Sequence, residues 1–204
     1  MNLGEIKIEA LKLMGANAGA QIHTSMLSSY INDEKYSDYL IAMPGAINRA
    51  FAVIENKGVL PSKDYVKNFN DKTYQGYQPI DVDADFLSVD NVTVRSTNGQ
   101  YFSTVQYYTQ GNVVYVELPP GAEVLNIKYR PKIQRIDEDS NNEQELDIPD
   151  NISALIPYFI KGDLFRFDEP DEANNARSWF EQGLDEIIRE NPSHRVETVF
   201  GGLV

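Results

Sequence analysis

Apolar side chains recur every three or four residues in the first quarter of the chain, which is the spacing of an amphipathic helix. One apolar stripe covers residues 3–14, and a broader one covers residues 34–57. Gly58 follows the second stripe and is a typical helix terminator. Pro44 lies inside this stripe, so we expect a kink or a break in that helix. The pattern therefore predicts two helices before residue 58.

The pattern changes between residue 59 and about residue 133, where Tyr, Val, Thr and Phe dominate and the apolar period falls towards two. Turn-forming residues separate these short runs, which predicts an antiparallel meander, a sandwich or a small barrel. The two-residue link Asp90-Asn91 is a hairpin candidate. The candidate strands are Phe86–Val89, Val92–Arg95, Tyr101–Tyr108, Val113–Leu118 and Glu123–Tyr129.

Helical spacing returns at about residue 152 and continues to about residue 190, with a corner at Asp168-Glu169-Pro170. The buried stripe predicted for the first of these helices contains Leu155, Phe159, Ile160, Leu164 and Phe167. The stripe predicted for the second contains Ala173, Ala176, Trp179, Phe180, Leu184, Ile187 and Ile188. Residues 134–151, which precede both helices, are rich in Asp and Glu and are interpreted as a solvated linker.

The two terminal helical regions cannot each bury an apolar stripe alone, so the simplest arrangement packs them together. The expected fold class is α+β, with a helical bundle of about four helices formed from both chain ends and an inserted antiparallel β domain (sandwich or small barrel). The expected helical domain comprises residues 1–58 and 134–192, and the β-rich domain comprises residues 59–133. Residues 193–204 are expected to form a C-terminal tail.

The formal net charge of −13 argues against a general electrostatic attraction for nucleic acid or anionic lipid. No dense cluster of Lys and Arg offsets it, although nucleic-acid readers normally present a basic face. Two explanations of the charge stay open: solubility, and a surface that DNA passes without sticking. No apolar run approaches the roughly 18 residues of a membrane-spanning helix, and the first five residues do not resemble a signal peptide.

Few residue types suited to catalysis or metal binding are present. The chain has no cysteine, which excludes disulfides, thiol catalysis and zinc–thiolate sites. Its two histidines, His23 and His194, belong to no catalytic or zinc-binding motif. The acidic segment begins like a calcium-binding loop, but Asn142 replaces the turn glycine and Ile148 replaces the bidentate glutamate. We therefore expect no catalytic residue, no cofactor and no metal site.

Two features bear on binding to partners. Many of the 12 tyrosines fall in or just before the β region, where they either line a face for sugar or protein or simply pack between strands. The tail from Ser193 to Val204 alternates weakly and is apolar at its end, so it either adds as a strand to a partner or docks on its own chain. Its candidate partner-interface residues are Val196, Val199, Phe200 and Leu203.

The C-terminal helical half has a distinctive order: an Ile-Pro start, a first helix, an acidic corner, and a second helix with alanines and an aromatic–Glu pair. It resembles the C-terminal helical hairpin of head–tail connector (adaptor) proteins of tailed bacteriophages. Residues 36–61 are similar to the helix that precedes the insertion in connectors carrying a β domain. The hairpin residues that carry the resemblance are Ile148-Pro149-Asp150-Asn151-Ile152, Leu155 to Leu164, Asp168-Glu169, Ala173, Ala176, Trp179-Phe180-Glu181 and Leu184.

The resemblance implies a non-enzymatic subunit of a homo-oligomeric ring, commonly of twelve copies, docked beneath the portal protein. It implies further contacts with tail or stopper proteins, and a DNA channel through which DNA passes without specific binding. The implied location is the neck of the virion, after assembly in the bacterial host cytoplasm and without a membrane. The alternative is a β-sandwich binding module on a helical stalk, which recognises a carbohydrate or a receptor through its tyrosines.

Overall fold

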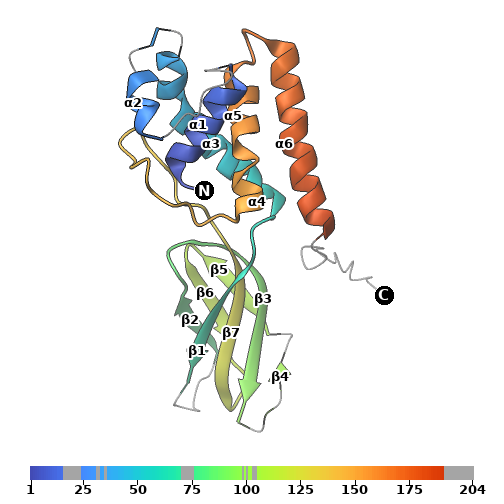
Figure 1. The fold of residues 1–204 in the computed structure, drawn as a ribbon. Helices are drawn as coiled ribbons and strands as arrows, with labels where there is room; N and C mark the ends of the chain where they lie inside the picture. Colours follow the sequence, from blue (N-terminus) through green and yellow to red (C-terminus); the bar gives the residue numbers. More distant parts are fainter. Residues whose placement is uncertain are drawn as a thin grey trace. The chain divides into compact units, whose positions relative to one another are not determined.

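The computed structural model describes residues 1–15, 24–30, 33–34, 36–69, 76–97, 99, 101–102 and 105–190. The chain is α+β, with helices and two small antiparallel sheets (Figure 1). It divides into two compact units. The helical unit combines Met1–Val59 with Arg135–Val204, and the β unit comprises Leu60–Gln134.

Segments from both ends of the sequence meet in the helical unit, where α5 contacts α1, α3 and α6. The predicted helices over residues 3–14 and 170–190 are confirmed. A 3-10 turn, Thr24–Met26, precedes α2. The helices are α1 (Leu3–Leu13), α2 (Leu27–Tyr30), α3 (Ser37–Lys57), α4 (Asp150–Ser153), α5 (Ile156–Leu164) and α6 (Pro170–Glu190).

We expected a kink or a break at Pro44; helix α3 runs through this proline without interruption, so the break is wrong. Proline removes one backbone hydrogen bond and normally kinks or breaks a helix. Here the buried face continues across it, because Met43 and Ile47 on either side are fully buried. Burial of this apolar face offsets the missing hydrogen bond. The predicted end is confirmed: Gly58 caps α3 in the left-handed conformation, with φ of 64°.

Two aromatic residues assigned to buried stripes are exposed instead, which corrects the prediction. Phe167 is 82% exposed and Trp179 is 65% exposed. Phe167 lies beyond the end of α5 at Leu164, so helical spacing no longer governs its direction. On α6 the buried stripe runs through Ala176 and Phe180, and Trp179 stands on the flank beside it. The structure therefore leaves two large aromatic side chains of the helical unit in contact with solvent.

The acidic segment is exposed at many positions, as expected for a solvated linker, but hydrogen bonds hold its backbone on the helical unit. We call residues 135–149 the acidic strap, because they lie along the helical unit. The side-chain amide of Asn48 on α3 accepts from the Ile136 N–H at 3.0 Å and donates to the Ile136 carbonyl at 2.7 Å. In the first turn of α1, the N–H groups of Leu3 and Gly4 donate to strap carbonyls of Gln144 and Asn142. The strap thus satisfies backbone donors that a helix N-terminus leaves unpaired.

We expect Asn48→Ala to lower the free energy of unfolding by about 2 kcal/mol, because both polar groups of the partly buried Ile136 backbone lose their partner. Urea unfolding of the full chain measures this change. Asn175→Ala, on the exposed face of α6, is the matched control and should stay within about 0.5 kcal/mol of the wild type. Equal effects of the two substitutions would mean that the strap is not held at Asn48.

Two antiparallel sheets form the β unit, with strand orders β1-β7-β3-β4 and β2-β6-β5. Both sheets contribute side chains to one hydrophobic core, including Ile80 and Val114 from one and Val94 and Ile127 from the other. The described strands do not close into a barrel, so that alternative is wrong. The strands are β1 (Lys63–Asn68), β2 (Tyr77–Asp81), β3 (Phe86–Ser96), β4 (Tyr101–Phe102), β5 (Tyr107–Gln110), β6 (Val113–Glu117) and β7 (Ala122–Pro131).

The hairpin predicted at Asp90-Asn91 is absent, because these residues lie within the single strand β3. Strand β7 pairs with β3 on both sides of this point, and the register shifts between Val89 and Asn91. Such a shift marks a bulge, which absorbs an extra residue without reversing the chain. The Asp90 carboxylate accepts from Arg130 Nε at 2.7 Å and so fixes the irregularity. The predicted strand Tyr101–Tyr108 is also corrected, since it divides into β4 and β5 in different sheets.

Candidate interaction sites

The candidate interface residues Val196, Val199, Phe200 and Leu203 lie outside the described residues, as do His23 and His194. In the described part of the chain, no group of three or more Asp, Glu or His side chains is arranged to hold a metal ion. No helix in that part is both long and apolar enough to cross a bilayer. The described structure offers three other features that could engage a partner.

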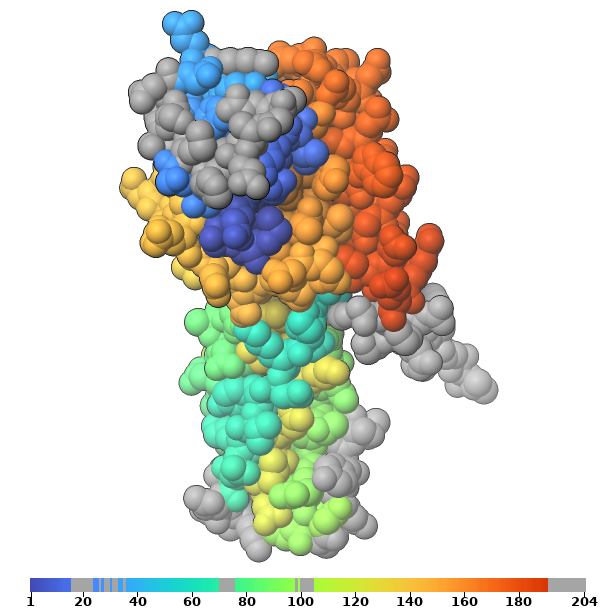
Figure 2. Space-filling view, viewed as in Figure 1, coloured from blue at the N-terminus to red at the C-terminus, as the bar shows by residue number. Residues whose placement is uncertain are grey.

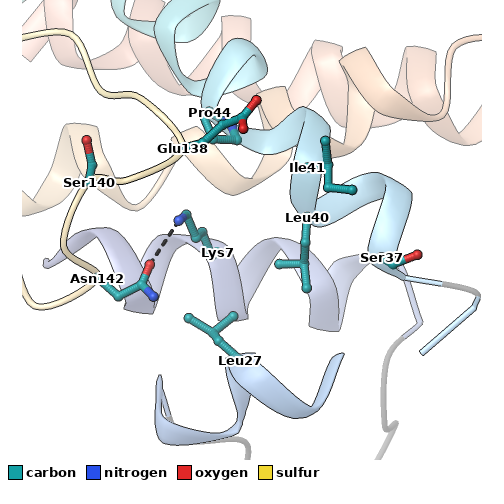
Figure 3. Close-up of a pocket in the computed structure, with 9 residues that line it drawn as sticks. All are labelled: Lys7, Leu27, Ser37, Leu40, Ile41, Pro44, Glu138, Ser140 and Asn142. Carbon is teal, nitrogen blue, oxygen red and sulfur yellow. Dashed lines mark hydrogen bonds between the residues drawn. The ribbon is translucent and has the colours of Figure 1, made fainter. Parts of the chain in front are cut away.

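The first feature is a cavity of about 200 Å³ in the helical unit. We call it the Lys7 cavity. Figure 3 shows the Lys7 side chain between α1 and the acidic strap, with Leu40 and Ile41 projecting from α3 and Leu27 from α2. Its apolar walls come from the helices and its polar wall from the strap. The lining residues are Lys7, Leu27, Ser37, Leu40, Ile41, Pro44, Glu138, Ser140 and Asn142.

Helix α1 and the strap together place the Lys7 ammonium. The Asn2 side chain and Glu5 form a reciprocal cap that fixes where α1 begins. Helix α1 is in close contact with the strap at Gly4. An added Cβ at this residue would lie only 3.0 Å from the Asn142 carbonyl oxygen. One turn later, Lys7 Nζ donates to Asn142 Oδ1 at 2.9 Å. The glycine therefore lets α1 approach the strap closely enough for this hydrogen bond.

Lys7 is a buried cation without a carboxylate partner among the described residues. Lys7 is only 8% exposed, and this burial lowers the pKa of its ammonium group below the ordinary value. An ammonium has three donors, and Asn142 takes one of them. Asp163, by contrast, forms ion pairs with both Arg49 and Arg177. A charge that is buried without an opposite charge destabilises the fold unless something else compensates it.

We expect Lys7→Met to raise the free energy of unfolding at neutral pH by on the order of 1 kcal/mol, since methionine keeps the volume and removes the buried charge. The folded state holds this pKa below the unfolded value, so protonated Lys7 destabilises the fold at pH values below the folded-state pKa. Stability of the wild type should rise with pH as Lys7 loses its proton below pH 10.5, the ordinary lysine pKa. Urea unfolding between neutral and alkaline pH measures both effects, and an unchanged pH profile in the variant would contradict this account.

The second feature is a group of aromatic rings in the β unit, which we call the tyrosine face: Tyr77, Tyr108 and Tyr115. The rings of Tyr108 and Tyr115 are stacked, with centroids 4.6 Å apart and an interplanar angle of 6°. Tyr77 meets Tyr108 edge-on at 5.2 Å. Val114 and Val116, which flank Tyr115 on β6, are buried in the core, so Tyr115 lies on the opposite face of the sheet. The arrangement provides a partly exposed aromatic surface.

The third feature is the pair of exposed aromatic residues on the α5–α6 hairpin, Phe167 and Trp179. The Arg166 guanidinium lies over the Phe167 ring at 4.5 Å from its centroid. Trp179 is the single tryptophan of the chain. On α3, Ile41 is similarly exposed, at 64%, where it borders the Lys7 cavity. Large exposed apolar side chains are typical of surfaces that contact other molecules.

Sequence reasoning missed the Lys7 cavity, although a local signal existed. Lys7 follows Leu3 by four residues and precedes Leu11 by four, so it lies on the apolar stripe of α1. A lysine at such a position is a sign of a polar element inside the core. Its partner Asn142 is distant in the sequence and could not be found from spacing.

Known proteins add no assignment to these features. No protein-family model and no curated protein sequence matches the chain.

Proposed function

We propose that the chain is a non-enzymatic structural subunit of a bacteriophage head–tail connector ring. In this proposal the ring lies beneath the portal protein and continues the DNA channel towards tail or stopper proteins. Helices from both chain ends form a bundle of about four helices that serves as the assembly platform. The ring resides in the neck of the virion after assembly in the host cytoplasm.

The exposed aromatic residues of the α5–α6 hairpin carry this proposal. Phe167 and Trp179 remain 82% and 65% exposed in the isolated chain. Interfaces between proteins are enriched in aromatic residues, and tryptophan is frequent among those that contribute most to binding. A ring of identical subunits buries such residues through head-to-tail contacts that close by rotation.

The charge of the chain supports the same function. The net charge is −13, and the acidic strap contributes Asp137, Glu138 and Asp139 at exposed positions. An acidic wall repels the phosphate backbone, so DNA moves along it without being held. A ring subunit that surrounds moving DNA benefits from this repulsion.

Sedimentation of the purified protein over a range of concentration and ionic strength tests the proposal. We expect one discrete large oligomer, and we expect salt to favour it. At about 1 M salt the Debye length falls to about 3 Å, which screens the repulsion between acidic subunits. A protein that stays monomeric at every concentration and salt level would contradict the proposed function.

A second function is favoured by the tyrosine face. Stacked and edge-on tyrosine rings on an open sheet suit the apolar face of a sugar ring or an aromatic-rich protein surface. A glycan array probed with the full chain tests carbohydrate binding, with Tyr108→Ala as the variant and Tyr158→Ala in the helical unit as the control. Binding that depends on Tyr108 supports a binding module, and no binding to any glycan removes the carbohydrate form of this alternative.

A further inference from the structure

We propose that Trp179 of one copy of the chain occupies the Lys7 cavity of the next copy. This inference rests on the proposed ring function and specifies one contact of its interface. The partner is therefore a second copy of the same chain, and the contact joins two different surfaces of the helical unit.

The Trp179 side chain protrudes from α6. The residues one turn before and after it on the same side of the helix are small, Ala176 and Gly183. Gly183 must stay small, because an added Cβ would lie 2.6 Å from a methyl group of Leu155. Two of the four residues one turn away from Trp179 are therefore small, and its side chain is 65% exposed.

The Lys7 cavity has a suitable size and lining for an aromatic ring. Its volume is about 200 Å³, and a protein cavity of about 150 Å³ lined by apolar residues admits benzene. Leu27, Leu40 and Pro44 supply apolar walls. Ile41 lines the cavity while it is 64% exposed, so it marks the rim at which an entering side chain makes first contact.

The charge at the cavity selects an aromatic occupant over an acidic one. The Lys7 ammonium has no carboxylate partner among the described residues, which alone would also suit an anion. Glu138 lines the cavity, however, and the neighbouring strap residues Asp137 and Asp139 are exposed acids. These carboxylates repel an anion but not a neutral ring. The face of an indole attracts a cation electrostatically, most strongly when the pair is desolvated.

The two surfaces lie on different sides of the helical unit. Helix α6 contacts α5, and α5 also contacts α1 and α3, which bear the cavity. Figure 1 shows α6 at one side of this unit and α2 with the start of α3 at the other. Figure 2 shows α6 in orange to red on the surface, apart from α1 in dark blue. Trp179 therefore reaches a cavity of another copy, and such head-to-tail contacts build a ring when the rotation closes.

Cross-linking between two single-cysteine proteins tests this contact, because the natural chain contains no cysteine. One protein carries Gln182→Cys, on the exposed face of α6 one turn from Trp179, and the other carries Ile41→Cys at the cavity rim. The two are mixed at about 1 M salt and treated with a short bis-maleimide. We expect a covalent heterodimer of the two proteins as the main product.

The two copies contribute different surfaces to the contact, so the same substitution in the other protein is the matched control. Trp179→Ala in the Gln182→Cys protein should reduce the heterodimer about tenfold or more, since it removes the inserted ring. The same substitution in the Ile41→Cys protein should leave the yield unchanged, because that copy contributes only its cavity. Tyr107→Ala in the Gln182→Cys protein, which removes an exposed aromatic residue of the β unit, should also leave it unchanged.

Three outcomes would overturn the inference. If Trp179→Ala leaves the heterodimer yield unchanged in both proteins, another contact holds the two copies together. Homodimers of the Gln182→Cys protein as the main product show that α6 meets α6 through a two-fold axis. In both cases a wild-type oligomer larger than a dimer, with rotational symmetry that closes a ring, would leave the proposed ring function standing. Absence of cross-links together with a monomeric wild type would overturn the inference and the ring function alike.

Discussion

Replacing Gly162 with valine is expected to lower the free energy of unfolding of the helical unit by about 3 kcal/mol. Gly162 on α5 lies against the backbone of α6. A Cβ at this position would lie 3.0 Å from the Ala173 carbonyl oxygen, 3.2 Å from the Arg177 amide nitrogen and 2.7 Å from Arg177 Cγ. Two of these atoms belong to the backbone of α6, so the helices must separate to admit a larger residue. Urea unfolding followed by circular dichroism measures the change.

The matched control for this substitution is Gly45→Val on α3. Gly45 is exposed, and an added Cβ there would meet only the guanidinium end of the Arg49 side chain, at 3.3 Å, and no backbone atom of another element. We expect this variant to be as stable as the wild type or slightly more stable, because valine has the higher helix propensity. A loss of stability that is equal for both variants would show that the α5–α6 contact does not depend on Gly162.

Phe180→Ala is expected to lower the free energy of unfolding by about 4 kcal/mol, as typical for a buried aromatic side chain. Phe180 is 1% exposed, and its ring meets the Phe159 ring edge-on with centroids 5.0 Å apart. This contact joins α5 to α6, so alanine leaves a cavity between the two helices. Thermal or urea unfolding of the full chain measures the loss.

Substitution of the neighbouring residue, Trp179, distinguishes an effect on monomer stability from an effect on assembly. Trp179→Ala should change the stability of the monomer by less than about 0.5 kcal/mol, because the side chain is mostly in solvent. The same substitution should abolish the salt-promoted oligomer. If Trp179→Ala destabilised the monomer as strongly as Phe180→Ala, its exposed position would be wrong and its role in assembly would lose its basis.

Local periodicity was sufficient to locate the long helices, since the spacing of apolar residues in α1, α3 and α6 is a property of the helix itself. It could not decide which flank of α6 is covered. Trp179 and Phe180 are adjacent, and both fit a broad stripe. Packing against α5, with its close contact at Gly162, determines which of the two side chains is buried. The residue spacing within one helix does not predict a contact between two helices.

Errors in the β unit and the strap have a similar cause. Asp90-Asn91 has the composition of a turn, yet β7 pairs on both sides of it and Arg130 holds the Asp90 carboxylate. The acidic composition predicted the exposure of this segment but not that Asn48 and the first turn of α1 bind its backbone. In each case a partner distant in sequence overrode the local preference. The Lys7 cavity depends on the same strap, so the site could not be assembled from the sequence alone.

Two parts of the helical unit hold the two proposed contact surfaces in place. Gly162 and Phe180 fix α6 on α5, and this rigid support holds Trp179 in a defined position on the outer flank. On the other side, Gly4 lets the strap close over α1 and form the polar wall of the Lys7 cavity. Preorganised surfaces bind with a smaller loss of conformational entropy. We expect, in consequence, that strap variants such as Asn48→Ala weaken assembly as well as stability.

Electron microscopy of the purified protein at high salt tests the proposed ring most directly. We expect closed rings with rotational symmetry, in which the α6 side of each subunit faces the α1 and strap side of the next. Images that contain only single subunits, or dimers related by a two-fold axis, would contradict it.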